Sequence, residues 1–252
     1  MQTVGLYSFP RSGSNWVRNM IYALATDRKT FNTQDILEYI VDHPDNHPES
    51  GRPISTRYGD YAFFKTHHKM VCDYQGNQID TRFFIYVYRN PLDVFVSYLN
   101  YIYINRADLQ IYYDLPLVSV QEHIERGTIR HFFSMFLTVG NISPGADQAG
   151  SWWDSIRRWH DLKARYGAFI FMLKYEDAME DPLNTFSPLA EFLNSNVSVE
   201  EALERTNYNF PKDGNFFWKM SNNYYKEYLP DELIEEYKYY YGAELKDIGY
   251  EI

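Results

Sequence analysis

Short apolar runs and helix-spaced apolar residues alternate along much of the chain. Four runs rich in β-branched and aromatic residues predict buried strands, at residues 3–7, 61–64, 82–88 and 169–173. After the first run, apolar residues stand at Val17, Met20, Ile21 and Leu24, which is the spacing of an amphipathic helix. The polar residues of these strand-to-helix turns are therefore the first candidates for binding and catalysis.

Further helices are predicted from capping residues and apolar spacing, at residues 36–41, 120–127, 128–137, 152–162 and 185–193. Trp159 lies at helical spacing with other apolar residues, so we assign it to core packing. The polar, Pro-rich residues 43–57 predict a loop, and His43 and His47 within it are interpreted as surface residues rather than metal ligands.

The turn between the first strand and the first helix combines Arg11, Ser12, Gly13, Ser14 and Asn15. A helix N-terminus presents unpaired backbone N–H groups, and these side chains add further donors, so the turn predicts a site for phosphate or sulfate. It is not a standard Walker A loop, because no Gly-Lys pair precedes a Ser or Thr. An ordinary capped helix after a buried strand is the alternative interpretation.

The second strand runs directly into Lys65 and His67. Side chains two residues apart on a strand point to the same side, and strand carboxyl ends face the ligand crevice of an open α/β sheet. Both side chains are therefore expected to reach a group bound at the first turn. His67 has the chemistry of a general base and Lys65 that of a charge stabiliser, although a solvated histidine at a strand end is an equally good interpretation.

Arg89 follows the third strand, and the next helix begins with Pro91 in its first turn. Asp93 complements the helix dipole, and Ser97 lies about two turns further on. A charged donor and a hydroxyl thus follow the third strand.

Together these turns resemble the cytosolic-type sulfotransferases, which use 3′-phosphoadenosine 5′-phosphosulfate (PAPS). The 5′-phosphosulfate loop of that family usually reads Tyr-Pro-Lys-Ser-Gly-Thr-Thr-Trp, and this chain has Phe-Pro-Arg-Ser-Gly-Ser-Asn-Trp at 9–16, with Arg11 in place of Lys. The 3′-phosphate motif, Arg-Asn-Pro-x-Asp-Val-x-Val-Ser-Tyr, is matched in full at 89–98. The Lys-Thr-His at 65–67 and the Tyr-Glu-Asp at 175–177 also resemble family segments.

The resemblance implies an α/β fold: one domain over 1–252, with a central parallel β-sheet flanked by helices and a P-loop-like first turn. It also implies sulfuryl transfer from PAPS to a hydroxyl or amine, leaving 3′-phosphoadenosine 5′-phosphate (PAP), without a metal. Residues from about 105 to 150 match least, and in the family this region helps to cover the acceptor. This variable acceptor-side segment therefore suggests an acceptor specific to this chain, and a solvated helical insert is the alternative interpretation for any single residue there.

The resemblance also assigns site residues. His67, Lys65 and Arg11 are the implied catalytic residues. The implied nucleotide-binding residues are Arg11, Ser12, Gly13, Ser14, Asn15, Trp16, Arg89, Ser97, Tyr175, Thr206, Tyr208 and Lys219.

Two C-terminal segments depart from the family pattern. The Arg-Lys-Gly that grips the 3′-phosphate in the family is replaced by Trp218-Lys219-Met220, which leaves Lys219 as the candidate contact. Lys226 and Glu235 fit the ends of the family's dimer motif, but Pro230-Asp231 replaces its central Thr-Val. The oligomeric state is therefore left open.

Net charge, cysteine content and the lengths of the apolar runs limit the functions and locations that we expect for this chain. A formal net charge of −10 argues against general nucleic-acid binding, so a phosphate site must be local. The single cysteine, Cys72, cannot form an intrachain disulfide and suits a reducing compartment. The first strand leaves no room for a signal peptide and no apolar run approaches the length of a membrane span, so we expect a soluble cytoplasmic protein without a membrane partner.

A small molecule is the expected acceptor. The aromatic content of 18% suits a planar or apolar compound, whereas the acidic residues of the middle segment suit a cationic alkaloid. Bacterial relatives of the family modify natural products, which favours that branch. Two alternatives stay open at this point: an inactive nucleotide-binding relative, and a P-loop phosphotransferase, which would need Mg²⁺ and Walker residues.

Overall fold

The computed structural model describes residues 1–69, 79–143, 149–209 and 221–251, and the chain divides into two compact units. We call residues 1–89 with 154–212 the sheet unit, and residues 90–153 with 213–252 the helical unit. Each unit is described by itself below.

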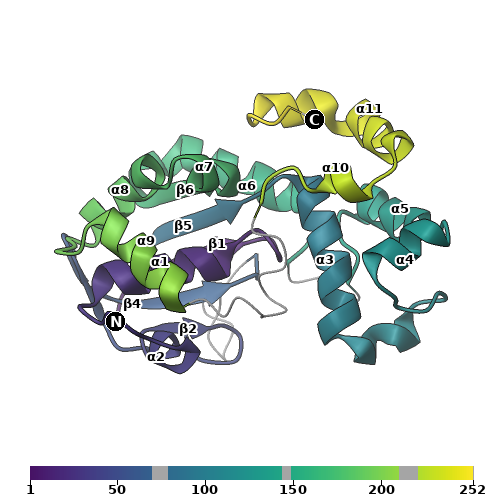
Figure 1. The fold of residues 1–252 in the computed structure, drawn as a ribbon. Coiled ribbons are helices and arrows are strands. Elements are labelled where there is room, and N and C mark those ends of the chain that lie inside the picture. The colour runs from purple at the N-terminus through teal and green to yellow at the C-terminus, as the bar shows by residue number, and fades with distance from the viewer. Residues whose placement is uncertain (70–78, 144–148, 210–220, 252) are drawn as a thin grey trace. The chain divides into compact units, whose positions relative to one another are not determined.

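The sheet unit is built on a six-stranded sheet with the main order β2-β4-β1-β5-β6 (Figure 1). Its strands are β1 (Thr3–Ser8), β2 (Ile40–Asp42), β3 (Ile54–Thr56), β4 (Gly59–Thr66), β5 (Thr81–Tyr88) and β6 (Ile170–Lys174). Strands on the main path pair in parallel, whereas β3 pairs antiparallel with β4. All six residues of β1 are buried, as expected of a strand covered on both faces.

Strand register brings the carboxyl ends of the parallel strands together. Tyr7 pairs with Thr66 and Ser8 with Val87, so β1, β4 and β5 end side by side. On the other side of β5, Tyr88 pairs with Lys174 of β6. The turns that follow these strands therefore lie at one edge of the sheet, where open α/β sheets bind ligands.

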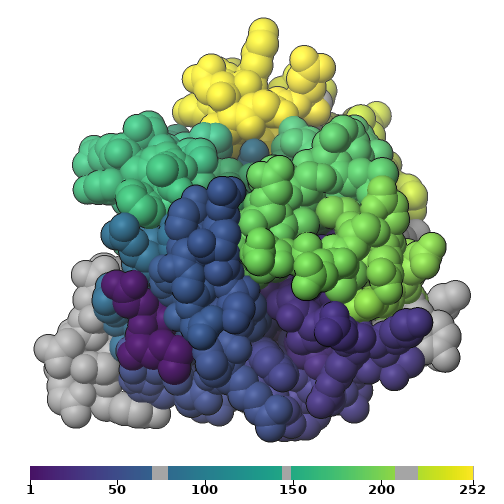
Figure 2. Space-filling view, turned by 90° about the vertical axis from the view of Figure 1, so that its left-hand side faces the viewer, coloured from purple at the N-terminus to yellow at the C-terminus, as the bar shows by residue number. Residues whose placement is uncertain are grey.

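Helices flank the sheet, which confirms the expected α/β architecture. They are α1 (Ser14–Ala25), α2 (Thr33–Leu37), α6 (Trp152–Tyr166), α7 (Tyr175–Glu180), α8 (Pro182–Phe192) and α9 (Val199–Asn209), with a short 3₁₀ turn η2 (Gly167–Phe169) before β6; α6 starts in the helical unit. α1 packs against α8 and α9, and Figure 2 shows the green surface of α8 and α9 beside the purple surface of the N-terminal segment. Trp159 of α6 stacks on Tyr86 with ring centroids 5.0 Å apart, so its predicted packing role is confirmed.

In the part of the chain that is described, the helical unit contains α3 (Pro91–Asn105), η1 (Ala107–Tyr112), α4 (Val120–Glu125), α5 (Ile129–Val139), α10 (Tyr225–Tyr228) and α11 (Asp231–Asp247). Aromatic side chains form its core: Phe95 of α3 meets Phe133 of α5 edge-on at 5.5 Å. Phe136 of α5 stacks on Tyr237 of α11 at 6.2 Å. The helices predicted near 120–127 and 128–137 are confirmed.

Two predictions from the sequence are wrong between residues 36 and 57. The expected helix at 36–41 ends at Leu37, and Ile40–Asp42 instead forms β2 beside β4. The predicted loop at 43–57 contains β3. Short apolar runs fit a helix or a strand equally well, and here pairing with β4 decides for the strand.

Candidate active site

The turn from β1 to α1 has the backbone of an anion-binding loop. Arg11 and Gly13 both adopt positive φ, of 69° and 97°. No side chain in the described part of the chain caps α1, and the N–H groups of Trp16 and Val17 both donate to the Gly13 carbonyl. Among the described residues, no partner is found for the N–H groups of Gly13, Ser14 and Asn15. These are the donors that a helix N-terminus offers to phosphate or sulfate.

Side chains of the same turn add buried polar atoms. Ser12 is 0% exposed, and its Oγ has no hydrogen-bond partner among the described residues. The Oδ1 of Asn15 is buried and unpartnered in the same sense. A buried hydroxyl without a partner carries a desolvation cost of about 1–3 kcal/mol, which an anionic oxygen at the loop would offset. The residues present therefore fit the group that the sequence predicts.

Tyr175 at the start of α7 fixes the loop from one side. Its ring lies so close to Gly13 that a Cβ there would be 2.4 Å from the ring Cδ2 atom. The guanidinium of Arg89 lies over the same ring at 4.0 Å, and Trp16 meets it edge-on at 5.8 Å. Tyr175 thus joins the turn from β1 to α1, α1 itself and the residue after β5 through one buried ring.

Replacing Gly13 with alanine should disturb both the fold and the loop. Ala disfavours a positive φ, and its methyl group would collide with the Tyr175 ring, so we expect the free energy of unfolding to fall by about 2–4 kcal/mol. Urea denaturation measures this. Gly59 is the matched control, because its φ of 122° is also positive but a methyl group added there would have no heavy atom of the described residues within 4 Å beyond its chain neighbours. Equal losses for Gly13→Ala and Gly59→Ala would contradict the steric part of the explanation.

His67 follows β4 and contacts the last residue of β1. Its Nδ1 lies 2.9 Å from the Ser8 carbonyl oxygen and 3.1 Å from Ser8 Oγ. A carbonyl oxygen only accepts, so Nδ1 carries the proton and the neutral ring has its lone pair on Nε2. Burial, followed by the positive charge of Lys65, lowers the pKa of His67 to about 3. The ring is therefore neutral near pH 7, in the form that accepts a proton.

Lys65 is held by a residue that the sequence reasoning missed. Its Nζ lies 3.2 Å from Oδ1 of Asp42, and Oδ2 of Asp42 accepts a hydrogen bond of 2.7 Å from Arg18 of α1. Burial raises the pKa of Asp42, but Lys65 and Arg18 outweigh it and lower that pKa overall. The signal was present in the sequence: Asp42 ends a β-branched run, and interpreting that run as a strand places its carboxylate beside Lys65.

The remaining predicted residues have different positions. Arg89 of the sheet unit and Ser97 of α3 are buried. Thr206 is also buried, with its hydroxyl donating to the Leu203 carbonyl at 2.9 Å within α9. Tyr208 lies in the last turn of α9, while Lys219 and Cys72 lie outside the described residues. The nucleotide contacts assigned to these positions stay predictions.

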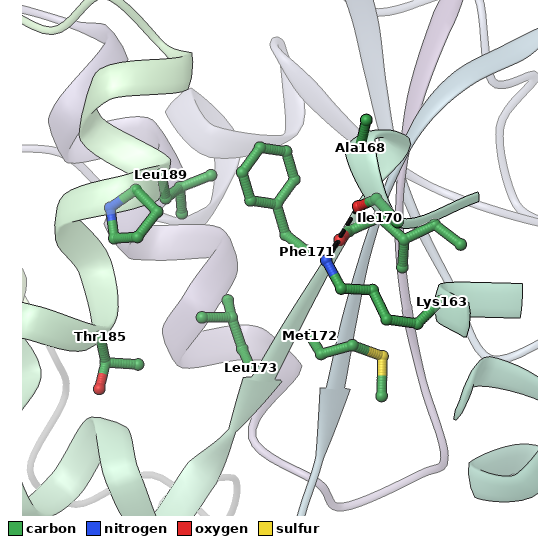
Figure 3. Close-up of a pocket in the computed structure, with 10 residues that line it drawn as sticks. Lys163, Ala168, Ile170, Phe171, Met172, Leu173, Thr185 and Leu189 are labelled. Atoms are coloured by element: carbon green, nitrogen blue, oxygen red, sulfur yellow. Dashed lines mark hydrogen bonds between the residues drawn. The ribbon is translucent and has the colours of Figure 1, made fainter. Parts of the chain in front are cut away.

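The described residues that line a cavity elsewhere in the sheet unit include none of the predicted site residues. The cavity has a volume of about 310 Å³ and lies between β6 and α8, lined mainly by apolar side chains (Figure 3). Lys163 at its edge donates from Nζ to the Gly167 and Ile170 carbonyls, at 2.9 and 2.6 Å. These bonds fasten α6 to the start of β6, so we assign Lys163 a structural role.

The described part of the chain has neither a metal-binding cluster nor a membrane-spanning helix. It holds no group of three or more His, Cys, Asp or Glu side chains placed to bind a metal ion. None of its helices is both long and apolar enough to cross a membrane.

The sheet edge and the loop together define a class of protein: an α/β fold with an uncapped helix N-terminus that can accept an anionic group, and with a lysine and a neutral histidine at the same sheet edge. The sulfotransferase domain model matches residues 2–249, and the chain belongs to this family. The expectation of a sulfotransferase is therefore confirmed.

Relatives and solved structures agree with this assignment. The chain is 24% identical to flavonol 4′-sulfotransferase of Flaveria chlorifolia, over 92% of this chain and 76% of that protein. It is 23% identical to amine sulfotransferase of Oryctolagus cuniculus, over 97% and 81%. Matches to other relatives span 59% and 56% of those proteins. Mouse sulfotransferase SULT7A1, solved with PAP, shares the fold with a TM-score of 0.64 at 19% identity, covering 98% of this chain and 86% of that one.

Proposed function

We propose that the chain transfers a sulfuryl group from PAPS to a hydroxyl or amine of a small molecule, with His67 as the general base. The observation that carries the proposal is the bond from His67 Nδ1 to the Ser8 carbonyl, which leaves Nε2 as acceptor beside the anion loop. A histidine fixed in this tautomer at the end of β4 is positioned to take a proton from an acceptor bound over the sheet edge.

In the proposed step, Nε2 of His67 removes the acceptor proton as the acceptor oxygen or nitrogen forms its bond to sulfur. The bond from sulfur to the bridging oxygen breaks, and the electron pair leaves with the phosphate of PAP. Lys65 and Arg11 stabilise the charge that develops on that oxygen. The backbone N–H groups of residues 13–15 and the Ser12 hydroxyl hold the 5′-phosphosulfate in line.

The nucleotide contacts follow the family motifs. We assign Arg89 and Ser97 to the 3′-phosphate, with Lys219 as a further contact. Tyr175, Thr206 and Tyr208 are assigned to the nucleoside, and Trp16 to the support of the loop. Packing underlies the assignments of Trp16 and Tyr175. The two buried rings contact each other, Trp16 also meets Phe186, and Tyr175 lies under the Arg89 guanidinium.

The class of acceptor is inferred from relatives rather than from a cavity in the structure. The names of two relatives, a flavonol and an amine sulfotransferase, support a phenolic hydroxyl or an amine as the nucleophile. Planar phenols and cationic amines, including natural products, are therefore the first acceptors to screen. The readout is the mass that the acceptor gains when it is sulfated in the presence of PAPS.

Calorimetric titration without added metal tests the nucleotide assignment. PAP should bind more tightly than ADP by roughly 10- to 100-fold, because ADP lacks the 3′-phosphate and the charge-assisted hydrogen bonds it would make. Ser97→Ala should reduce this preference and Arg89→Met should reduce it further.

Each outcome separates the alternatives. A preference for PAP that falls in both variants supports the sulfotransferase site. Equal affinity for PAP and ADP, or transfer that requires Mg²⁺, would favour a phosphotransferase instead. Tight PAP binding without turnover on any phenol or amine would favour an inactive nucleotide-binding relative.

A further inference from the structure

Arg18, Asp42 and Lys65 form a bridge behind the proposed active site. Asp42 ends β2 and is the register partner of Lys65 on β4, so the two side chains project from adjacent strands. One carboxylate oxygen meets Lys65 Nζ at 3.2 Å, and the other accepts from Arg18 at 2.7 Å. The three side chains come from separate elements of the sheet unit: α1, β2 and β4.

The bridge is more than a surface ion pair. The side chains of Arg18 and Lys65 are only 8% and 11% exposed, and that of Asp42 is 31% exposed. Burying two cations around one carboxylate is often less favourable than apolar packing. Such a cluster is therefore weak evidence that these residues are there to stabilise the fold. One net positive charge is left at the edge of the sheet where the loop binds its anion. This placement suits a role in positioning charge.

From this geometry we propose that Asp42 is a positioning residue for the transfer reaction: it holds the Lys65 ammonium at the sheet edge and keeps it charged there. The inference rests on the proposed function, because Lys65 is assigned there to the leaving oxygen. A lysine has a long flexible stem, and its anchoring contact with Asp42 limits the volume that Nζ explores. Pre-positioned charge is worth more to a transition state than charge that must be ordered during the reaction.

The charged groups around Lys65 determine the direction in which each substitution should shift its pKa. Burial lowers the pKa of Lys65, Asp42 raises it, and Arg18 on α1 lowers it. Asp45, beyond the end of β2, also raises the pKa of Lys65, and His67 is the first residue after β4. Removing Asp42 should therefore lower the pKa of Lys65, whereas removing the charge of Arg18 should raise it.

Two single variants test these opposite directions. In Asp42→Asn, we expect the alkaline limb of the pH profile of kcat to move to lower pH. We also expect kcat to fall roughly 10- to 100-fold, with a smaller change in the KM for PAPS. In Arg18→Gln, the limb should move to higher pH. Asp42→Glu should partly restore kcat. Glu38→Gln is the matched control, because it removes a carboxylate paired with Arg52 at 3.3 Å just before β2.

A second readout does not depend on turnover. The ¹³Cε shift of Lys65, assigned with Lys65→Arg, should titrate at lower pH in Asp42→Asn and at higher pH in Arg18→Gln. The double variant Asp42→Asn/Arg18→Gln covers the case in which Asp42→Asn alone does not fold, and its midpoint should lie below that of Arg18→Gln.

The outcomes distinguish this proposal from the one it rests on. Equal midpoints in wild type and Asp42→Asn, a shift in the same direction in both variants, or wild-type kcat in Asp42→Asn would overturn the role of Asp42. Opposite shifts together with the expected fall in kcat would support it. A wild type that binds PAP but transfers nothing would overturn the proposed function, even where the Lys65 titration follows the expected signs.

Discussion

Replacing His67 with alanine is expected to reduce kcat by about 10²–10⁴-fold while the affinity for PAP stays nearly unchanged. The reason is that Nε2 of His67 is the proposed proton acceptor, whereas the anion loop holds the nucleotide. Steady-state turnover with a phenolic acceptor and calorimetry with PAP measure the two effects separately. A near-normal rate in His67→Ala would rule out this residue as the base.

His68 is the matched control for His67. It is the next residue, and its ring packs edge-on against His43 at 4.9 Å instead of contacting Ser8. His68→Ala should therefore keep most of the turnover. The pH profile adds a check on the sign: a pKa of about 3 keeps His67 in its base form throughout pH 5–8, so this residue should cause no acid limb in that range. An acid limb near pH 6.5 that disappears in His67→Ala would contradict the burial argument.

Replacing Asp93 with alanine should produce the largest loss of stability in the helical unit. Asp93 is 0% exposed, and its two carboxylate oxygens accept hydrogen bonds of 2.9 Å from the backbone N–H groups of Asn223 and Tyr225. Alanine would leave both N–H groups without these acceptors, and that of Tyr225 is buried. We expect the free energy of unfolding to fall by about 2–5 kcal/mol, measured by urea denaturation.

Asp108→Ala provides the comparison within the same unit. Asp108 is an exposed carboxylate paired with Arg106 at 2.8 Å, and removing such a surface pair should cost at most about 1 kcal/mol. Asp93→Asn keeps one acceptor oxygen and should fall between Asp93→Ala and wild type. A loss below about 1 kcal/mol for Asp93→Ala would show that the two N–H groups find water or other partners.

These contacts change the meaning of the Arg-Asn-Pro-x-Asp motif. From the sequence, Asp93 was expected only to complement the dipole of the helix that it begins. In the structure it joins the start of α3 to residues 223–225, 130 positions or more along the chain. A side chain's partner at that separation is not encoded in local spacing, so the sequence alone predicts the helix start and not the bond across the unit.

The same distinction explains which parts of the fold were predictable. β1, β5 and β6 are long or strongly β-prone runs beside helices with clear apolar spacing, and local pattern is enough for them. β2 and β3 have three residues each and exist because β4 offers its edge, which no local pattern records. Asp42 was missed for this reason, although Lys65 and His67 were both identified as site candidates.

The anion loop between β1 and α1 is built in a way that tolerates divergence of the amino-acid sequence around it. Three of its donors are main-chain N–H groups, whose direction depends on the backbone at Arg11 and Gly13 rather than on the identity of neighbouring side chains. Substitutions such as Arg for Lys at 11, or Asn for Thr at 15, therefore leave the cradle itself in place. An anion site of this kind is compatible with wide sequence drift around it, as long as position 13 keeps a residue without a side chain.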